Sequence, residues 1–203
     1  VLQISASYHA YSETGAFSAW VNDYLSASEA LRPFYKHIPN EQGVLDAIEA
    51  RSLFETDREL LVRKFSDTYE SVSAHEQVKK NISLLKQKTC FTICAAHQPH
   101  LFAGPLYIVY KIIHAIKLAA SLQQRFPQYQ FVPVFFIGSE DADLNELGNM
   151  HVLGQKYTWQ TNQKGAVGRM LVDDALLQLM NEMEQALHTT PHGTELMQGL
   201  RKA

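Results

Sequence analysis

Residues Phe91 to Arg125 read FTICAAHQPHLFAGPLYIVYKIIHAIKLAASLQQR, and this segment fixes the fold class that we expect. Its apolar start predicts a strand over 90–96 that is buried on both faces. The strand ends in the polar turn His97-Gln98-Pro99-His100. Gly104-Pro105 then starts a long helix, because proline is tolerated in a first helical turn and apolar residues recur after it at helical spacing. Strand, turn and helix in this order are the first half of a βαβ unit.

A second buried strand is predicted over 131–137, which reads FVPVFFI. At its carboxyl end the chain continues as Gly138-Ser139-Glu140-Asp141-Ala142-Asp143. In open α/β sheets, ligands bind beyond the carboxyl ends of the strands. We therefore expect the turn after the first strand and the acidic segment after the second to face one binding site.

The rest of the chain suggests three regions around this unit. Residues 1–88 are predicted to be mostly helical, 89–150 to form the βαβ core, and 151–203 to begin an inserted or connecting region. Short strands over 151–159 and 169–172 are expected to pair as a hairpin, followed by helices. The predicted fold class is α/β, with a Rossmann-like parallel sheet. Because so few parallel strands are visible, we expect the sheet to be incomplete in this chain and the chain to be a fragment.

Composition limits the possible functions. The chain has 203 residues, 46% of them hydrophobic, and a net charge of −3, which gives no reason to expect nucleic acid as a partner. No apolar run approaches the roughly 20 residues that span a bilayer, and no secretory signal opens the sequence. Cys90 and Cys94 are too few for a disulfide framework. We expect a cytoplasmic protein with no membrane partner.

The histidines of the first turn are the leading candidates for chemistry. Imidazole can act as a general acid or base near neutral pH, or donate to an anion when protonated. The following helix presents free N–H groups at its amino end, which also favour an anion. We therefore assign His97 and His100 to catalysis and Gln98 to substrate binding. The alternative is that the turn merely reverses the chain and its histidines are solvated.

The acidic segment supplies the second set of candidates. Its carboxylates could bind an amine, accept hydrogen bonds from ribose hydroxyls or hold Mg²⁺. The alternative is helix capping, which acidic residues commonly provide. We assign Asp141 to catalysis and Glu140 and Asp143 to substrate binding. The remaining predicted substrate-binding residues lie at the amino end of the long helix and are Gly104, Tyr107 and Lys111.

Several of these segments resemble one known family. His97-Gln98-Pro99-His100 and the GPLY segment from Gly104 to Tyr107 are similar to the QQPG and TGPLY motifs of the BshC family, and Tyr110-Lys111 is similar to its IYK motif. Residues 133–143 resemble the PVFWIA and EDHDF motifs that follow. The resemblance extends to VNDYL and LRPFY, which lie at 21–25 and 31–35, and so covers nearly the whole chain.

The resemblance implies a Rossmann-like core related to nucleotidylyl-transferring class I synthetases. It implies a ligase that adds L-cysteine to glucosaminyl malate in bacillithiol biosynthesis, through an activated carboxylate. ATP or another nucleotide would be the cofactor, and a coiled coil in the longer protein would form a homodimer. Because we expect the chain to be a fragment, we also expect that it does not turn over on its own.

The chain departs from the family pattern at three positions. His97 and His100 stand where the family commonly has Gln and Gly, and their spacing resembles the HxGH signature of class I synthetases with Pro99 in place of glycine. Ala142 stands where the family commonly has His. Two other functions therefore stay open, namely a metal-dependent hydrolase or transferase that uses His97, His100, Asp141 and Asp143, and a non-catalytic binding domain.

Overall fold

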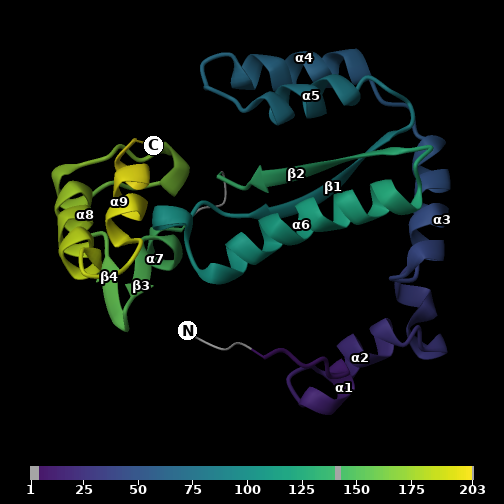
Figure 1. Ribbon diagram of the computed structural model, residues 1–203, viewed down its shortest axis with the longest axis horizontal. Coiled ribbons are helices and arrows are strands. Elements are labelled where there is room, and N and C mark those ends of the chain that lie inside the picture. Colours follow the sequence, from purple (N-terminus) through teal and green to yellow (C-terminus); the bar gives the residue numbers. More distant parts are fainter. Residues whose placement is uncertain (1–4, 140–142, 203) are drawn as a thin grey trace. The chain divides into compact units, whose positions relative to one another are not determined.

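The computed structural model of the protein describes residues 5–139 and 143–202, which fall into two compact units, Val1–Arg63 and Lys64–Ala203. The described part of the first unit contains helices but no strand (Figure 1). Its elements are the helices α1 (Tyr11–Thr14), α2 (Ala19–Leu25) and α3 (Glu41–Ser52), the 3-10 helix η1 (Glu29–Phe34), and the start of α4 (Arg58–Tyr69).

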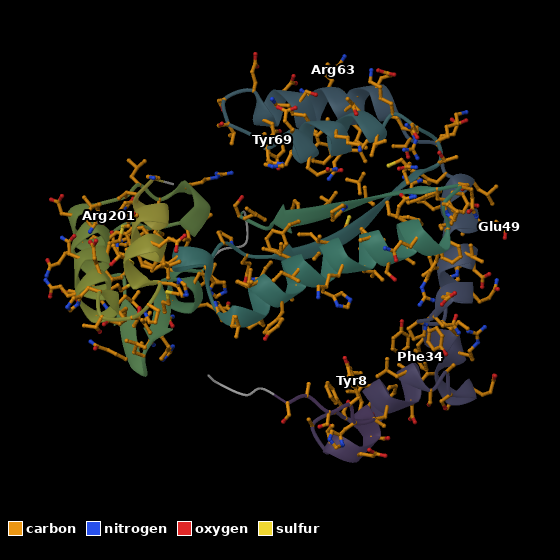
Figure 2. All side chains as sticks on the ribbon, viewed as in Figure 1. Tyr8, Phe34, Glu49, Arg63, Tyr69 and Arg201 are labelled. Atoms are coloured by element: carbon orange, nitrogen blue, oxygen red, sulfur yellow. The ribbon has the colours of Figure 1, made fainter. Side chains whose placement is uncertain are left out.

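The first unit buries few side chains of its own. Leu31 from η1 and Ile48 from α3 are buried, and the Asn40 side chain caps α3 by accepting a hydrogen bond from the Gly43 N–H at 3.0 Å. Phe34 remains 76% exposed and is labelled in Figure 2. All of the predicted site residues lie in the second unit, so the first unit supplies none of them.

The second unit contains the predicted βαβ core. Its first elements after α4 are α5 (Glu76–Leu84), β1 (Cys90–His97), the 3-10 helix η2 (Leu101–Ala103), α6 (Leu106–Arg125) and β2 (Gln130–Ile137). β1 and β2 pair in parallel, with a register that runs from Cys90 opposite Gln130 to His97 opposite Ile137. The long helix α6 contacts both strands (Figure 1). The Rossmann-like α/β prediction is confirmed at this level.

One prediction about β1 is wrong, because the strand is not buried on both faces. Along it, Thr92, Cys94 and Ala96 are exposed while the residues between them are half-buried. The described sheet has only these two parallel strands, so α6 shields one face and leaves the alternate side chains of β1 open. The apolar run shows that a strand forms, but the number of layers around it decides its burial.

The hairpin of the second unit also differs from the prediction. β3 (Asn149–Val152) pairs antiparallel with β4 (Gln155–Thr158), so both strands come from the segment expected to be one strand. The connection has two residues, Leu153 at φ 49° and Gly154 at φ 83°, and such turns with positive φ suit two-residue hairpins. Residues 169–172 form no strand, and Arg169 is instead the last residue of the 3-10 helix η3 (Val167–Arg169).

The last part of the chain forms a compact apolar cluster. Helices α8 (Asp174–Leu187) and α9 (Gly193–Lys202) pack together, and Arg201, labelled in Figure 2, joins them through Glu184 at 2.7 Å. The short helix α7 (Leu144–Leu147) precedes the hairpin. Leu101, from the turn after β1, is buried in the same cluster as the hairpin and helix side chains. Those side chains are Tyr157, Trp159, Leu176, Leu179, Met180, Met183, Leu187 and Met197.

Asp173 organises the polar border of this cluster. It caps α8, accepting from the Leu176 N–H at 3.0 Å. The carboxylate also accepts from Trp159 Nε1 at 2.8 Å and from the Thr161 hydroxyl at 2.7 Å. The Thr161 hydrogen bond, followed by those from Leu176 and Trp159, lowers the pKa of Asp173 to about 2.

Replacing this carboxylate should make the stability of the protein less dependent on pH. The folded pKa of Asp173 lies below the ordinary value of 3.8, so its contribution is present above that value and is lost as pH falls through about 2. Asp173→Asn should therefore lower Tm at neutral pH, and the difference from wild type should shrink at the acid end. Thermal unfolding across this pH range measures it, with the exposed neighbour change Asp174→Asn as control. Equal losses for the two variants would contradict the assignment.

Candidate functional site

The site lies where the two parallel strands end. His97 is the last residue of β1 and faces Ile137 in the register. Its carbonyl oxygen accepts a hydrogen bond from the Gly138 N–H at 3.0 Å. This hydrogen bond joins the ends of the two strands, because Gly138 is the first residue after β2. This is the position at which parallel α/β sheets bind ligands.

Both ring nitrogens of His97 are occupied. Nδ1 lies 3.1 Å from the Gln98 carbonyl oxygen, and Nε2 lies 2.9 Å from the Tyr107 hydroxyl. Because a carbonyl oxygen only accepts, Nδ1 carries the proton of the neutral ring, and Nε2 accepts from Tyr107. His97 is thereby fixed in orientation and tautomer by the turn on one side and α6 on the other.

His100 is different, because one of its nitrogens lacks a partner. Its ring centroid lies 5.0 Å from that of His97. Nε2 is shielded from solvent and has no hydrogen-bond partner among the described residues. Burial, and next the proximity of His97, lower the pKa of His100, while Glu146 acts in the opposite direction. His100 is thus a neutral imidazole near neutral pH, with a nitrogen left for another group.

Gly104 allows the turn to pass close to His100. Its φ is 65°, and a Cβ at this position would lie 2.6 Å from both His100 Cβ and Ile108 Cδ1. Phe102 also has a positive φ of 52°. The side chains of Leu101 and Phe102 pack in or against the apolar cluster, which holds this strained backbone in place. Gly104 therefore has a structural role here, and its predicted contact with substrate stays a prediction.

Lys111 and Tyr107 complete the wall that α6 provides. Lys111 Nζ donates to the Ala96 carbonyl oxygen at 3.3 Å and lies 5.7 Å from the Tyr107 ring centroid. Pro105 precedes the helix and supplies no side-chain cap, so the first N–H groups of α6 are not capped by that side chain. The structure thus brings together five predicted site residues, which are His97, His100, Gly104, Tyr107 and Lys111.

The acidic segment is only partly described. Glu140 and Asp141 lie outside the described residues, as does Ala142. Asp143 caps α7, accepting from the Asn145 N–H at 2.8 Å, which is the capping alternative stated above. α7 begins at Leu144.

Sequence reasoning missed Glu146. This carboxylate lies in α7 and acts electrostatically on His100. The available signal was the spacing from Asp143, since an acidic residue three positions after a helix cap faces the start of the same helix. An acidic group therefore does act electrostatically on His100, although it is a residue that the sequence analysis did not assign.

The metal hypothesis and a membrane location find no support in the described structure. Among residues 5–139 and 143–202, no three His, Cys, Asp or Glu side chains are grouped so that they could hold a metal ion. Asp141, one of the proposed ligands, lies outside that range. No described helix is both long and apolar enough to cross a bilayer.

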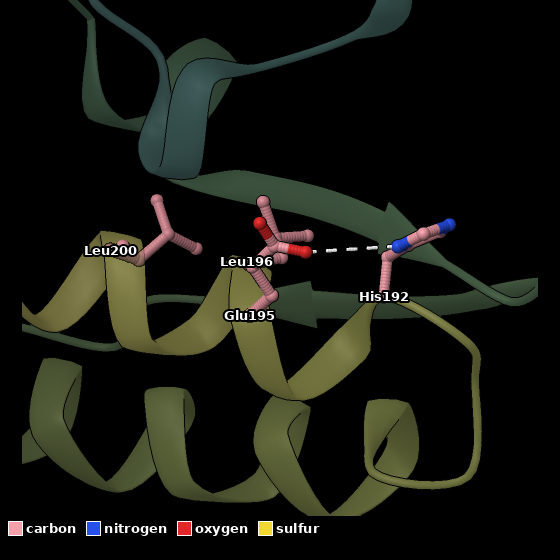
Figure 3. Close-up of a pocket in the computed structure, with 5 residues that line it drawn as sticks. His192, Glu195, Leu196 and Leu200 are labelled. Atoms are coloured by element: carbon pink, nitrogen blue, oxygen red, sulfur yellow. Dashed lines mark ion pairs between the residues drawn. The ribbon is translucent and has the colours of Figure 1, made fainter.

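An open hollow of about 440 Å³ lies elsewhere, along α9 (Figure 3). Leu196, Gly199 and Leu200 line it, and at one end His192 Nδ1 lies 3.7 Å from Glu195 Oε2. Both members of this pair are strongly exposed, so water screens their interaction. No predicted site residue lines the hollow, and it is not the site described here.

A parallel strand pair, a crossover helix and a polar turn at the strand ends define a Rossmann-like α/β domain, and the candidate site is at the carboxyl edge of its sheet. Comparison with known families agrees. A sequence model described as "Bacillithiol biosynthesis BshC, N-terminal Rossmann-like domain" matches residues 4–203. The chain therefore belongs to the BshC family.

Curated relatives point to the same family, and each is named "Putative cysteine ligase BshC". The relative from Cytophaga hutchinsonii is 40% identical over 75% of this chain and 29% of its own length. That from Flavobacterium psychrophilum is 36% identical over 79% of this chain and 31% of its own length. That from Prosthecochloris aestuarii is 26% identical over 92% of this chain and 35% of its own length. The chain thus spans about a third of the length of these relatives.

The contact between Gly104 and His100 gives a direct test of the turn. Gly104→Ala should lower the free energy of unfolding more than Gly154→Ala, by about 1–3 kcal/mol, because only the first forces a methyl group into occupied space. Gly154 is the matched control, since it also has a positive φ but no atom within 4 Å of the added Cβ. Chemical denaturation of both variants measures the difference. Equal losses would show that the close contact of Gly104 with His100 does not restrict the residue at position 104.

Proposed function

We propose that the protein to which this chain belongs is a ligase that joins L-cysteine to glucosaminyl malate, giving bacillithiol. The amide would form between the cysteine carboxyl group and the amino group of the sugar. Membership of the BshC family and the names of the relatives support this reaction. The observation that carries it in the structure is the neutral His100 ring, whose Nε2 has no described partner at the strand ends.

Amide formation by an amine requires a base. As the nitrogen bonds to the carbonyl carbon, the activating group must leave that carbon with its bonding electrons and the nitrogen must lose a proton, which a neutral imidazole is suited to accept. His100 fits this role better than His97, whose nitrogens are both engaged. In this proposal His97 positions the turn, and Asp141 is a second catalytic group. Gln98, Glu140 and Asp143 would bind polar groups of the substrates.

An activated carboxylate is also needed, and ATP or another nucleotide would supply the activation. The amino end of α6, which Pro105 leaves without a side-chain cap, fits an anionic group because helix N–H groups and the helix dipole favour negative charge. Lys111 lies one to two turns into that helix and adds a cation. These groups would hold the anion while His100 meets the reacting atoms.

The remaining parts of the proposal concern the longer protein. It would act in the cytoplasm on small molecules, without nucleic acid or membrane as partner. A coiled coil beyond this chain would form a homodimer. This chain alone would not turn over, since it spans about a third of the length of its relatives.

The test is to supply the full-length protein with glucosaminyl malate, L-cysteine and ATP. The expected product has the summed mass of the two substrates less one water, detected by mass spectrometry. His100→Ala should lower kcat about 10²- to 10⁴-fold, the range over which a general base contributes. His114→Ala is the matched control, because His114 is an exposed histidine of α6.

The outcomes separate the parts of the proposal. No product from the wild-type protein would reject the ligase function, and binding of both substrates without product would favour the non-catalytic alternative. Product formation with equal rates for the two histidine variants would retain the function and reject the role of His100.

A further inference from the structure

A third segment reaches the carboxyl edge of the parallel strands. A Cβ added to Gly168, the middle residue of η3, would lie 2.7 Å from Ser139 Cβ. Ser139 follows β2 by two residues, and its neighbour Gly138 is bonded to the His97 carbonyl. η3 therefore lies against the end of β2, on the edge that carries the histidine turn (Figure 1).

The backbone around η3 is held from both sides. Val167 and Met170 pack against the apolar cluster that contains Leu101. The Gln163 side chain accepts from the Leu171 N–H at 2.8 Å and donates to the Leu171 carbonyl oxygen at 2.8 Å. Arg169 is thus carried on a fixed turn rather than on a free loop.

The Arg169 side chain has no comparable restraint. It is exposed, and no ion pair or hydrogen bond joins its guanidinium to another described residue. Arg201, by contrast, is held by Glu184 and Asn181 at 2.7 Å and 2.6 Å. A guanidinium matches the geometry of a carboxylate or phosphate, to which it can donate two parallel hydrogen bonds.

We propose that Arg169 binds an oxyanion, a carboxylate or phosphate group, of the ligand held at the ends of β1 and β2. This rests on the proposed function, in which one substrate is a malate conjugate and a nucleotide supplies phosphates. The amino end of α6, which has no side-chain cap from Pro105, also favours an anion. Burial lowers the pKa of His100, so this ring does not compete for the negative charge.

Calorimetric titration of the full-length protein with L-malate, and separately with inorganic phosphate, tests the site without requiring turnover. Arg169→Gln should raise the Kd of the bound probe at least about 10-fold, because a hydrogen bond to a charged group contributes roughly 1.5–3 kcal/mol. Arg169→Lys should recover part of the loss. Lys164→Gln is the matched control, since Lys164 is an exposed cation five residues earlier in the same segment.

A Kd for Arg169→Gln within twofold of the Lys164→Gln value for both probes would overturn the proposal, and so would a wild-type protein that binds neither probe. A loss for malate alone identifies a substrate carboxylate as the ligand, and a loss for phosphate alone identifies a nucleotide phosphate. Failure of the ligase function appears separately, as the absence of product, and leaves these titrations interpretable. An unchanged Tm for Arg169→Gln would show that its raised Kd comes from lost binding contacts and not from unfolding.

Discussion

The burial of Leu101 is the constraint on which the candidate site depends. This residue follows His100 directly, and its side chain enters the apolar cluster formed by the hairpin and by α8 and α9. Burying a leucine contributes about 1.5–3 kcal/mol, comparable to the strain of the left-handed backbone at Phe102. The buried Leu101 side chain therefore stabilises a turn conformation that would be unfavourable in an isolated loop. In this conformation the histidines are held between the strand ends and α6.

Within that turn the two histidines have different environments. His97 lies between a backbone carbonyl and the Tyr107 hydroxyl, which together fix its tautomer. Burial lowers the pKa of His100, and its Nε2 has no hydrogen-bond partner among the described residues. A buried nitrogen without a partner costs about 1–3 kcal/mol, and a ligand that bonds to it would remove this cost. His97 is held by two partners, whereas Nε2 of His100 has none among the described residues. For this reason we assign positioning to His97 and proton transfer to His100.

Much of the core could be predicted from sequence, because strand, Gly104-Pro105 and amphipathic helix are local signals. The hairpin was mispaired because a leucine such as Leu153 gives no sign that it adopts a positive φ. The open face of β1 was missed because an apolar run does not reveal how many layers cover it. The burial of Leu101 and the proximity of Glu146 to His100 depend on contacts with residues tens of positions away in the chain, so no local pattern could predict them.

Backbone hydrogen exchange of the full-length protein after Leu101→Ala tests the central role of this anchor. The substitution should cost about 2–5 kcal/mol, as other large-to-small changes in cores do, and the amides of residues 100–104 should exchange faster, while the middle of α6 stays protected. Leu106→Ala is the matched control, because Leu106 lies at the other end of the turn and is 66% exposed. Unchanged exchange at residues 100–104 in a destabilised Leu101→Ala protein would contradict the account.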